Sequence, residues 1–97
     1  MNKICYTYMV RCRDGSLYAG WTNSLEERIA SHNSGKGAKY TRNRGPVLLA
    51  YKKEFDTKSE AMSHEYFLKR LKKSEKEALV SIYLAREVKT NYHCQGS

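Results

Sequence analysis

Long apolar runs, prolines and paired cysteines are scarce in this 97-residue chain, which contains one proline and three cysteines. No stretch comes near the roughly 18 consecutive apolar residues that a transmembrane helix requires. The first residues lack both the long apolar segment and the small-residue cleavage site of a signal peptide. We therefore expect a cytoplasmic protein without a membrane-spanning segment.

The cysteines do not follow the pattern of a disulfide framework or of a metal site. Cys5, Cys12 and Cys94 are odd in number and none belongs to a CxxC pair. The three histidines are also scattered along the chain. We expect reduced thiols, and the spacing does not favour a structural zinc site.

Positive charge dominates the composition. Lysine and arginine number 18 against 10 aspartates and glutamates, so the formal net charge is +8 and the pI is about 9.5. Such an excess favours polyanionic partners, of which nucleic acid is the commonest. An anionic membrane surface and ribosomal RNA remain open at this stage.

Length and hydrophobic patterning indicate one small domain of the α+β class. The Asp14-Gly15 pair predicts a hairpin between the first two strands. The predicted strands cover 4–12, 17–22 and 47–55, and the predicted helices cover 24–33, 58–72 and 75–88. The order is therefore ββαβαα, a small sheet covered by helices. Residues 1–88 form the domain, and 89–97 are expected to be a flexible C-terminal tail.

Capping boxes mark the starts of the three predicted helices. Each places a serine or threonine three residues before a glutamate: Ser24 and Glu27, Thr57 and Glu60, Ser74 and Glu77. Helical spacing also predicts which side chains face the core. These are Leu25 and Ile29 on the first helix, and Leu79, Ile82 and Tyr83 on the last.

Three tyrosines lie on the predicted hairpin, at Tyr6, Tyr8 and Tyr18. Alternation along a strand places Tyr6 and Tyr8 on the same face. Cross-strand aromatic packing is the common role of such residues in hairpins, and spacing alone favours it. The alternative is that the phenol hydroxyls bind a water, a phosphate or a base.

Arg28 and His32 lie four residues apart on the first predicted helix, so they share one face. Arginine can hold phosphate oxygens in a bidentate manner, and histidine can exchange a proton near neutral pH. The pair therefore suits phosphodiester chemistry. A solvated helix face is the alternative.

Glu65 lies on the second predicted helix, with Lys69 four residues later. One interpretation is a surface ion pair worth about 0.2–0.5 kcal/mol. The other is a carboxylate ligand for Mg²⁺, whose protein sites often use one or two carboxylates and complete the shell with water and substrate phosphate. Helical spacing does not choose between them.

The segment 34–46 is a glycine-containing basic loop. Four cations without an opposing acid surround one tyrosine in it: Lys36, Lys39, Tyr40, Arg42 and Arg44. Cations on such a loop can follow a phosphate backbone while the aromatic ring stacks on a base, so we favour nucleic-acid contact over a merely solubilising loop. A second basic run, at 69–73, is interpreted as a solvated face with a secondary binding role.

Taken together, these features resemble the GIY-YIG nuclease family, in particular its small single-domain bacterial members. Tyr6-Thr7-Tyr8 stands where the family has its first triplet, and Tyr18-Ala19-Gly20 matches the second. The stretches YAGWTNSLEERIASHNSGKGAKYTR and EFDTKSEAMSHEYFLKRLKKSEKEAL are similar to segments of those proteins. The resemblance covers roughly residues 4 to 80, and it departs from the family pattern in lacking Gly and Ile in the first triplet and Ile in the second.

The resemblance implies a three-stranded antiparallel sheet flanked by helices and metal-dependent hydrolysis of DNA phosphodiesters. By resemblance, Tyr8 positions or activates the attacking water and Tyr18 helps to place the water or the phosphate. Arg28 neutralises the phosphate, His32 exchanges a proton, and Glu65 binds Mg²⁺ or Mn²⁺. In this interpretation Tyr6 packs.

The first hypothesis is therefore a DNA endonuclease, with DNA repair or recombination as the setting that the resemblance suggests. The second is a basic module that binds DNA or RNA with little or no nuclease activity. The third is a ribosome- or RNA-associated structural protein. We expect no membrane partner, and we expect a homodimer or a partner protein as a source of specificity beyond the domain itself.

Overall fold

The protein folds as a three-stranded antiparallel sheet with helices on both faces. The computed structural model describes residues 4–96, with side chains through residue 87. The strand order is β2-β1-β3, with β1 in the centre. The elements are β1 (Cys5–Arg11), β2 (Leu17–Thr22), α1 (Leu25–Asn33), β3 (Leu48–Phe55), α2 (Lys58–Arg70) and α3 (Lys73–Gly96). The predicted α+β fold and the order ββαβαα are confirmed.

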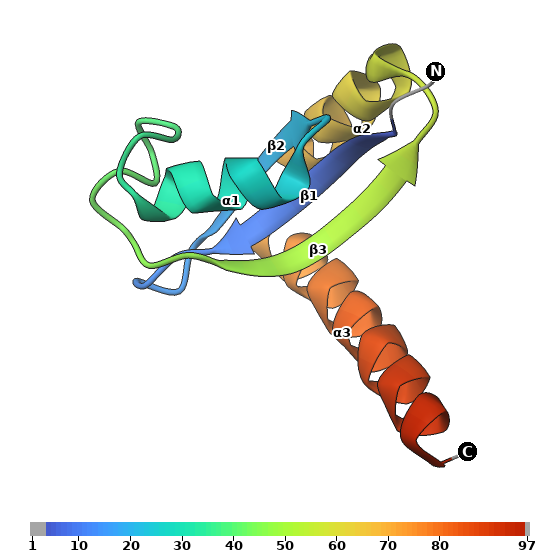
Figure 1. Ribbon diagram of the computed structural model, residues 1–97. Helices are drawn as coiled ribbons and strands as arrows, with labels where there is room; N and C mark the ends of the chain where they lie inside the picture. The colour runs from blue at the N-terminus through green and yellow to red at the C-terminus, as the bar shows by residue number, and fades with distance from the viewer. Residues whose placement is uncertain (1–3, 97) are drawn as a thin grey trace.

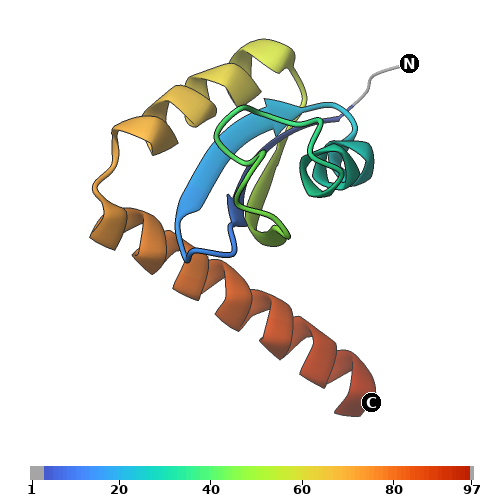
Figure 2. The ribbon, with the colours of Figure 1, turned by 90° about the vertical axis from the view of Figure 1, so that its left-hand side faces the viewer.

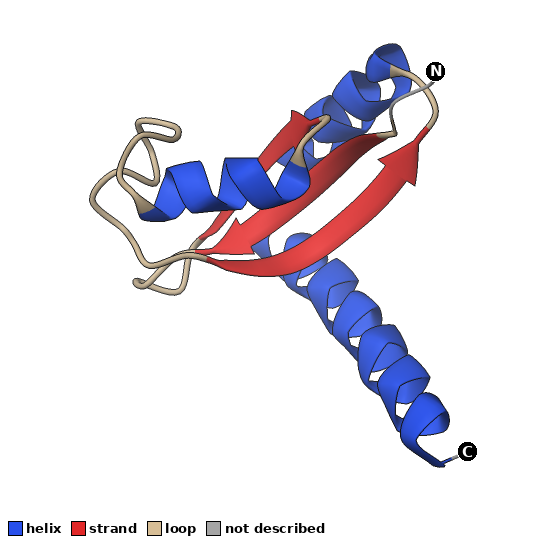
Figure 3. Ribbon diagram, viewed as in Figure 1, coloured by secondary structure: helices blue, strands red, loops and turns tan. Residues whose placement is uncertain are grey.

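The helices divide between the two sides of the sheet. Helix α1 lies across one face, and α2 lies on the other, as the two perpendicular views show (Figures 1 and 2). Helix α3 begins beside the sheet and then extends away from it (Figure 3). Among the described helices, none has the combined length and apolar character that crossing a membrane demands.

Alternation along β1 supplies a core on each side of the sheet. On the side of α2 and α3, buried Met9 packs with Leu68 of α2 and Val80 of α3. On the side of α1, Tyr8 and Val10 form a second cluster. The partly buried residues that pack on this cluster include both predicted core residues of the first helix, Leu25 and Ile29.

The predicted hairpin is present, with residues 12–16 connecting β1 to β2. Gly15 has a φ of +89°, which favours glycine, and the Asp14 carboxylate accepts hydrogen bonds from the backbone N–H and the hydroxyl of Ser16. Asp14 itself does not have positive φ, so only the glycine of the pair uses that freedom.

Two of the three predicted capping boxes are wrong. Thr57 caps α2 as expected, because its hydroxyl accepts from the backbone N–H of Glu60 at 3.2 Å. Ser24 is the N-cap of α1, but its side chain makes no cap hydrogen bond. The Ser24 N–H instead donates to the hydroxyl of Thr22, which holds the chain at the end of β2.

The third box fails because a neighbouring pair takes its place. Glu75 accepts from the backbone N–H of Lys72 at 2.8 Å, so α3 begins at Lys73. Glu77 is thereby free to bind Arg11 of β1.

Helix α3 differs from the sequence prediction in one core residue and in its length. Ile82 is 56% exposed and not buried as predicted, whereas Leu79 and Tyr83 pack on the core. Residue 82 faces outward because the helix leaves the sheet, so only one narrow face meets it. The helix continues beyond the predicted end at 88 to Gly96; the side chains of 88–96 and residue 97 lie outside the described part, and flexibility of 89–97 stays a prediction.

Candidate active site

A buried hydrogen bond between a strand and a helix forms the centre of the candidate site. Tyr8 Oη lies 2.9 Å from His32 Nε2, and both residues are 1% exposed. Tyr8 points from central strand β1 toward α1, and His32 comes from the last turn of α1. The fold therefore joins two residues that the sequence separates.

Two glycines leave the space that this pair occupies. Gly20 lies opposite Tyr8 in the β1–β2 register, and a Cβ built on Gly20 would stand 2.6 Å from Tyr8 Oη. A Cβ built on Gly37 would overlap the His32 ring and stand 2.8 Å from its Cα. Any larger side chain at either position would push the tyrosine or the histidine away.

Arg28 adds a positive charge to the same hydroxyl. It lies one helical turn before His32, is half-buried, and directs its Nε–H toward Tyr8 Oη at 3.4 Å. That distance is long for a hydrogen bond, so the interaction is weak. The guanidinium therefore lies near the tyrosine but makes no strong hydrogen bond to it.

Burial and Arg28 set the protonation states of the pair. Burial raises the pKa of Tyr8 above its usual value of 10.0, and Arg28 offsets part of that rise. Burial, with the nearby Arg28 charge, lowers the pKa of His32 below its usual 6.5. At neutral pH the tyrosine is therefore a phenol and the histidine a neutral imidazole.

Tyr18 connects this pair to the basic loop. Its ring meets the His32 ring edge-on with centroids 5.5 Å apart, and it stacks on Tyr40 at 5.7 Å. The Arg44 guanidinium carbon lies 4.2 Å from the centre of the Tyr40 ring. The Tyr40 ring thus already has two neighbours packed against it, which leaves less of it for stacking on a base.

Glu65 and Lys69 bring α2 to the same site. Glu65 Oε2 lies 3.0 Å from Lys69 Nζ, so the ion pair of the first interpretation does form. The Glu65 side chain is only 20% exposed, and its negative charge is among the causes that raise the pKa of Tyr8. Lys69 Nζ also lies 5.8 Å from the Tyr18 ring centre. Glu65 is therefore close enough for its charge to act on Tyr8, and its partner Lys69 lies beside Tyr18.

Not all of the positive charges on the basic loop lack an acidic partner. Lys36, Lys39 and Arg42 are exposed along it. Arg44, however, donates from Nε to Asp14 at 3.1 Å, which corrects the expectation of four unopposed cations. Because Asp14 belongs to the hairpin turn, this ion pair ties the loop to the end of the sheet.

Two residues of the site escape sequence reasoning. Thr41 is fully buried, and its hydroxyl oxygen lies 2.7 Å from His32 Nδ1. Asn33 exchanges two side-chain hydrogen bonds with the backbone of Val47, at 2.6 and 3.3 Å, which fixes the end of α1 to the start of β3. Neither is part of a periodic pattern. The sequence feature that could have pointed to Thr41 is that it is an uncharged hydroxyl residue among the cations of the loop.

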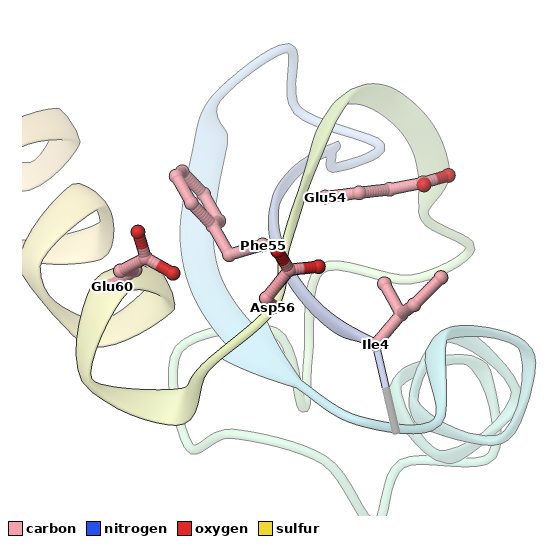
Figure 4. Close-up of a pocket in the computed structure, with 5 residues that line it drawn as sticks. All are labelled: Ile4, Glu54, Phe55, Asp56 and Glu60. Carbon is pink, nitrogen blue, oxygen red and sulfur yellow. The ribbon is translucent and has the colours of Figure 1, made fainter. Parts of the chain in front are cut away.

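A hollow of about 290 Å³ lies elsewhere, where β1 begins and β3 ends. It is lined by Ile4, Glu54, Phe55, Asp56 and Glu60 (Figure 4). In Figure 4 Glu54 and Glu60 lie on opposite sides of Asp56, so the three acids do not converge on one point. Their negative charge also opposes phosphate. This hollow does not fit the chemistry of the Tyr8 site.

Comparison with known proteins assigns the chain to a family. The model of the GIY-YIG catalytic domain matches residues 4–78. The chain belongs to the GIY-YIG family. The match contains the candidate site residues Tyr8, Tyr18, Arg28, His32 and Glu65 together with the whole basic loop.

Relatives of this chain share most of their length with it. It is 55% identical to a UPF0213 protein of Clostridium perfringens over 78% of this chain and 82% of the relative. It is 54% identical to a UPF0213 protein of Oceanobacillus iheyensis over 82% of this chain and 93% of the relative. The predicted likeness to small single-domain members is therefore confirmed.

Solved structures agree with the fold. The solution structure of the UPF0213 protein BH0048 from Bacillus halodurans superposes with a TM-score of 0.54 at 49% identity, covering 81% of this chain and 84% of that one. The solution structure of protein EF2693 from E. faecalis gives a TM-score of 0.55 at 40% identity, covering 87% and 93%.

Proposed function

We propose that the protein is a metal-dependent endonuclease that hydrolyses phosphodiester bonds of DNA. The observation that carries the proposal is the buried Tyr8–His32 hydrogen bond, with Arg28 against the same hydroxyl and the Glu65 charge close enough to act on it. These groups can serve phosphodiester hydrolysis, because a proton acceptor can activate water, a cation can stabilise the developing charge and a carboxylate can hold a metal ion. Membership in the GIY-YIG family supports the same reaction class.

In the proposed mechanism, Tyr8 relays a proton from the attacking water to His32 and is not a phenolate before the reaction. Its raised pKa keeps it a phenol at neutral pH. Arg28 can only donate to Tyr8 Oη, so the tyrosine's own proton points to His32 Nε2. Water gives its proton to Tyr8 Oη as Tyr8 gives its own to neutral His32. The hydroxide attacks phosphorus, and the P–O bond to the leaving group breaks. The leaving oxygen then takes a proton from water. His32 later releases its proton to solvent.

Arg28 is proposed to exchange partners when DNA binds. In the free protein its Nε–H makes only the long 3.4 Å contact to Tyr8 Oη. A phosphate is a much stronger acceptor, and a guanidinium can bind it in a bidentate manner. Movement of the arginine onto the phosphate uncovers the Tyr8 oxygen for the attacking water and places positive charge where negative charge develops.

Glu65 is the proposed ligand for Mg²⁺ or Mn²⁺. Among the residues with described side chains, no group of three or more histidines, cysteines or acids is placed to hold a metal ion, so at Glu65 a metal would take its other ligands from water and phosphate. A cation already lies against this carboxylate, because Lys69 Nζ is 3.0 Å away, so the site suits a positive charge. When bound, the metal would stabilise charge on the phosphate oxygens.

DNA is the proposed substrate, in repair or recombination and in the cytoplasm. Lys36, Lys39 and Arg42 would contact the phosphate backbone beyond the scissile bond, with Tyr40, Arg44 and Lys69 at the rim of the site. The net charge of +8 supports a polyanionic substrate such as DNA. Sequence or structure preference would come from the domain, from a homodimer or from a partner protein.

A second candidate function is nucleic-acid binding without cleavage. The observation that favours it is the same charge together with the burial of Tyr8, whose hydroxyl is covered in the free protein. In that case the Tyr8–His32 bond would hold the fold together, and RNA would bind as well as DNA.

Nicking of supercoiled plasmid separates the two candidates. Wild-type protein is incubated with plasmid or with single-stranded DNA, with Mg²⁺, with Mn²⁺ and with EDTA, and binding is measured in parallel. We expect cleavage that needs the metal and stops in EDTA. Salt-sensitive binding to DNA and RNA with no cleavage under any condition would instead establish the binding module.

A further inference from the structure

We infer that Thr41 is a positioning residue that fixes His32 in the tautomer with the proton on Nδ1, which leaves Nε2 free to accept from Tyr8. The inference deepens the proposed function, because it names the group that orients the proton acceptor. It starts from three buried polar groups in series: the hydroxyl of Tyr8, the ring of His32 and the hydroxyl of Thr41.

The contacts of Thr41 offer its proton two acceptors, the backbone oxygen of Ala38 and His32 Nδ1. Its hydroxyl lies 3.0 Å from the backbone oxygen of Ala38 and 2.7 Å from His32 Nδ1. A hydroxyl has one proton, and a carbonyl oxygen can only accept. If the proton goes to Ala38, the hydroxyl oxygen accepts from His32, so Nδ1 carries a hydrogen.

The other end of the series selects the arrangement in which the Thr41 proton goes to Ala38. Arg28 cannot accept a proton from Tyr8, so if Nε2 were protonated the buried phenol proton would have no acceptor among the contacts of its oxygen. With the proton on Nδ1, each group donates once along the series: His32 to Thr41, Thr41 to Ala38 and Tyr8 to His32. Across the described side chains, every buried nitrogen or oxygen has a partner, and this arrangement uses each contact without conflict.

The loop is built to hold Thr41 in place. Thr41 is fully buried although both its neighbours are exposed. Its backbone N–H donates to the same Ala38 oxygen at 3.1 Å, which closes a tight turn. Gly37 allows this turn to approach the histidine, since a Cβ there would overlap the ring. The basic loop therefore does more than present cations, because its inner side orients the imidazole.

Nitrogen-15 NMR of the imidazole rings tests the inference directly. In ¹⁵N-labelled wild-type protein above pH 6.5, we expect the His32 spectrum of a ring protonated at Nδ1 and unprotonated at Nε2. Thr41→Val keeps the shape but removes the acceptor, so the ring should shift toward the other tautomer or a mixture. Thr41→Ser should retain the wild-type spectrum.

Cleavage supplies a second readout. By analogy with other groups that orient a reactive histidine, Thr41→Val should lower the cleavage rate about 10- to 100-fold, and Thr41→Ser should restore most of it. A wild-type ring protonated at Nε2, or an unchanged spectrum in folded Thr41→Val, would overturn the inference. If the valine variant does not fold, the wild-type spectrum alone decides. The spectrum needs no activity, so failure of the proposed nuclease function would not be mistaken for failure of this inference.

Discussion

Gly20 lies opposite Tyr8 across the β1–β2 pair, at a distance where a Cβ would stand 2.6 Å from the tyrosine hydroxyl. The last residue of the second triplet thus provides the space for the tyrosine of the first. This relationship gives a physical reason for a glycine that the hairpin pattern alone does not require.

Replacing Gly20 with alanine should therefore disturb the site and the fold together. The added methyl group meets Tyr8 Oη, and overpacking of this kind costs about 1–3 kcal/mol. We expect a lower free energy of unfolding in a urea titration. Gly45→Ala is the matched control, because a Cβ there meets nothing within 4 Å. Equal stability of the two variants would show that Tyr8 adapts and that Gly20 is not required for packing.

A second prediction concerns the ion pair that joins β1 to α3. Arg11 donates to the two carboxylate oxygens of Glu77 at 2.5 and 2.7 Å, and this lowers the pKa of Glu77. Both side chains are about one-third exposed, so water weakens the pair. Glu77→Gln should cost about 0.5–1 kcal/mol in the free energy of unfolding.

Salt provides the control for this pair. The difference between wild type and Glu77→Gln should shrink at high ionic strength because an exposed pair is screened. A difference that does not change with salt would mean that hydrogen bonding or packing, and not charge, accounts for the effect.

Much of the fold follows from the sequence because it rests on local patterns. Hydrophobic patterning over 4–12 predicts the first strand, and the spacing of Leu25 and Ile29 predicts the inner face of α1. These patterns depend on the period of the backbone and not on distant partners.

The wrong predictions have a common cause: the side chain that each residue contacts is decided by the tertiary structure. The Ser74 capping box predicts that Glu77 caps its own helix, but Glu77 binds Arg11, which comes close only after the chain folds. Ile82 has the spacing of a core residue, but only the face of α3 that carries Leu79 and Tyr83 meets the sheet, and Ile82 is 56% exposed. Local spacing indicates which side chains can meet, and the tertiary arrangement decides which do.

The site was predictable to a similar degree. Helical spacing places Arg28 and His32 on one face, and the family resemblance adds Tyr8 and Glu65. The hydrogen bond from Tyr8 to His32 and the contact of His32 with Thr41 depend on how β1, α1 and the basic loop pack. Residue spacing carries no information about those contacts.

A third prediction follows from the buried, neutral state of His32. Its pKa is lowered in the folded protein, so near pH 6 the unfolded chain binds more protons than the folded one. The stability that neutral burial contributes is therefore present above pH 6.5 and is lost as the pH falls through the folded pKa. We expect the free energy of unfolding to decrease with acidification over this range.

Subtracting a variant isolates the histidine. His32→Gln cannot titrate, so its stability should depend less on pH than that of the wild type between neutral pH and pH 5. NMR titration of the His32 ring should give a midpoint below 6.5. A midpoint at or above that value would contradict the assignment of a neutral, buried imidazole.

A fourth prediction separates Tyr8 from its neighbour Tyr6 on the same strand. Tyr8→Phe removes the hydroxyl that contacts His32 and Arg28, and removal of a proton-transfer group costs about 10²- to 10⁴-fold in rate. We expect that loss in single-turnover cleavage, with DNA affinity little changed. Tyr6→Phe is the control, because Tyr6 is half-buried with Lys52 Nζ 5.8 Å from its ring centre and serves packing. Equal losses in both variants would assign the effect to the strand and not to the Tyr8 hydroxyl.

The central claim is that Tyr8, Arg28, His32 and Glu65 form one metal-dependent phosphodiesterase site. The most direct measurement is the rate of plasmid nicking over a Mg²⁺ titration for wild type, Glu65→Gln and Glu54→Gln. Both substitutions remove one negative charge, but Glu54 is exposed and lines the hollow where β3 ends, whereas the Glu65 charge acts on Tyr8. We expect wild type and Glu54→Gln to nick DNA with the same metal dependence while Glu65→Gln is inactive. Equal nicking by all three proteins would contradict the site.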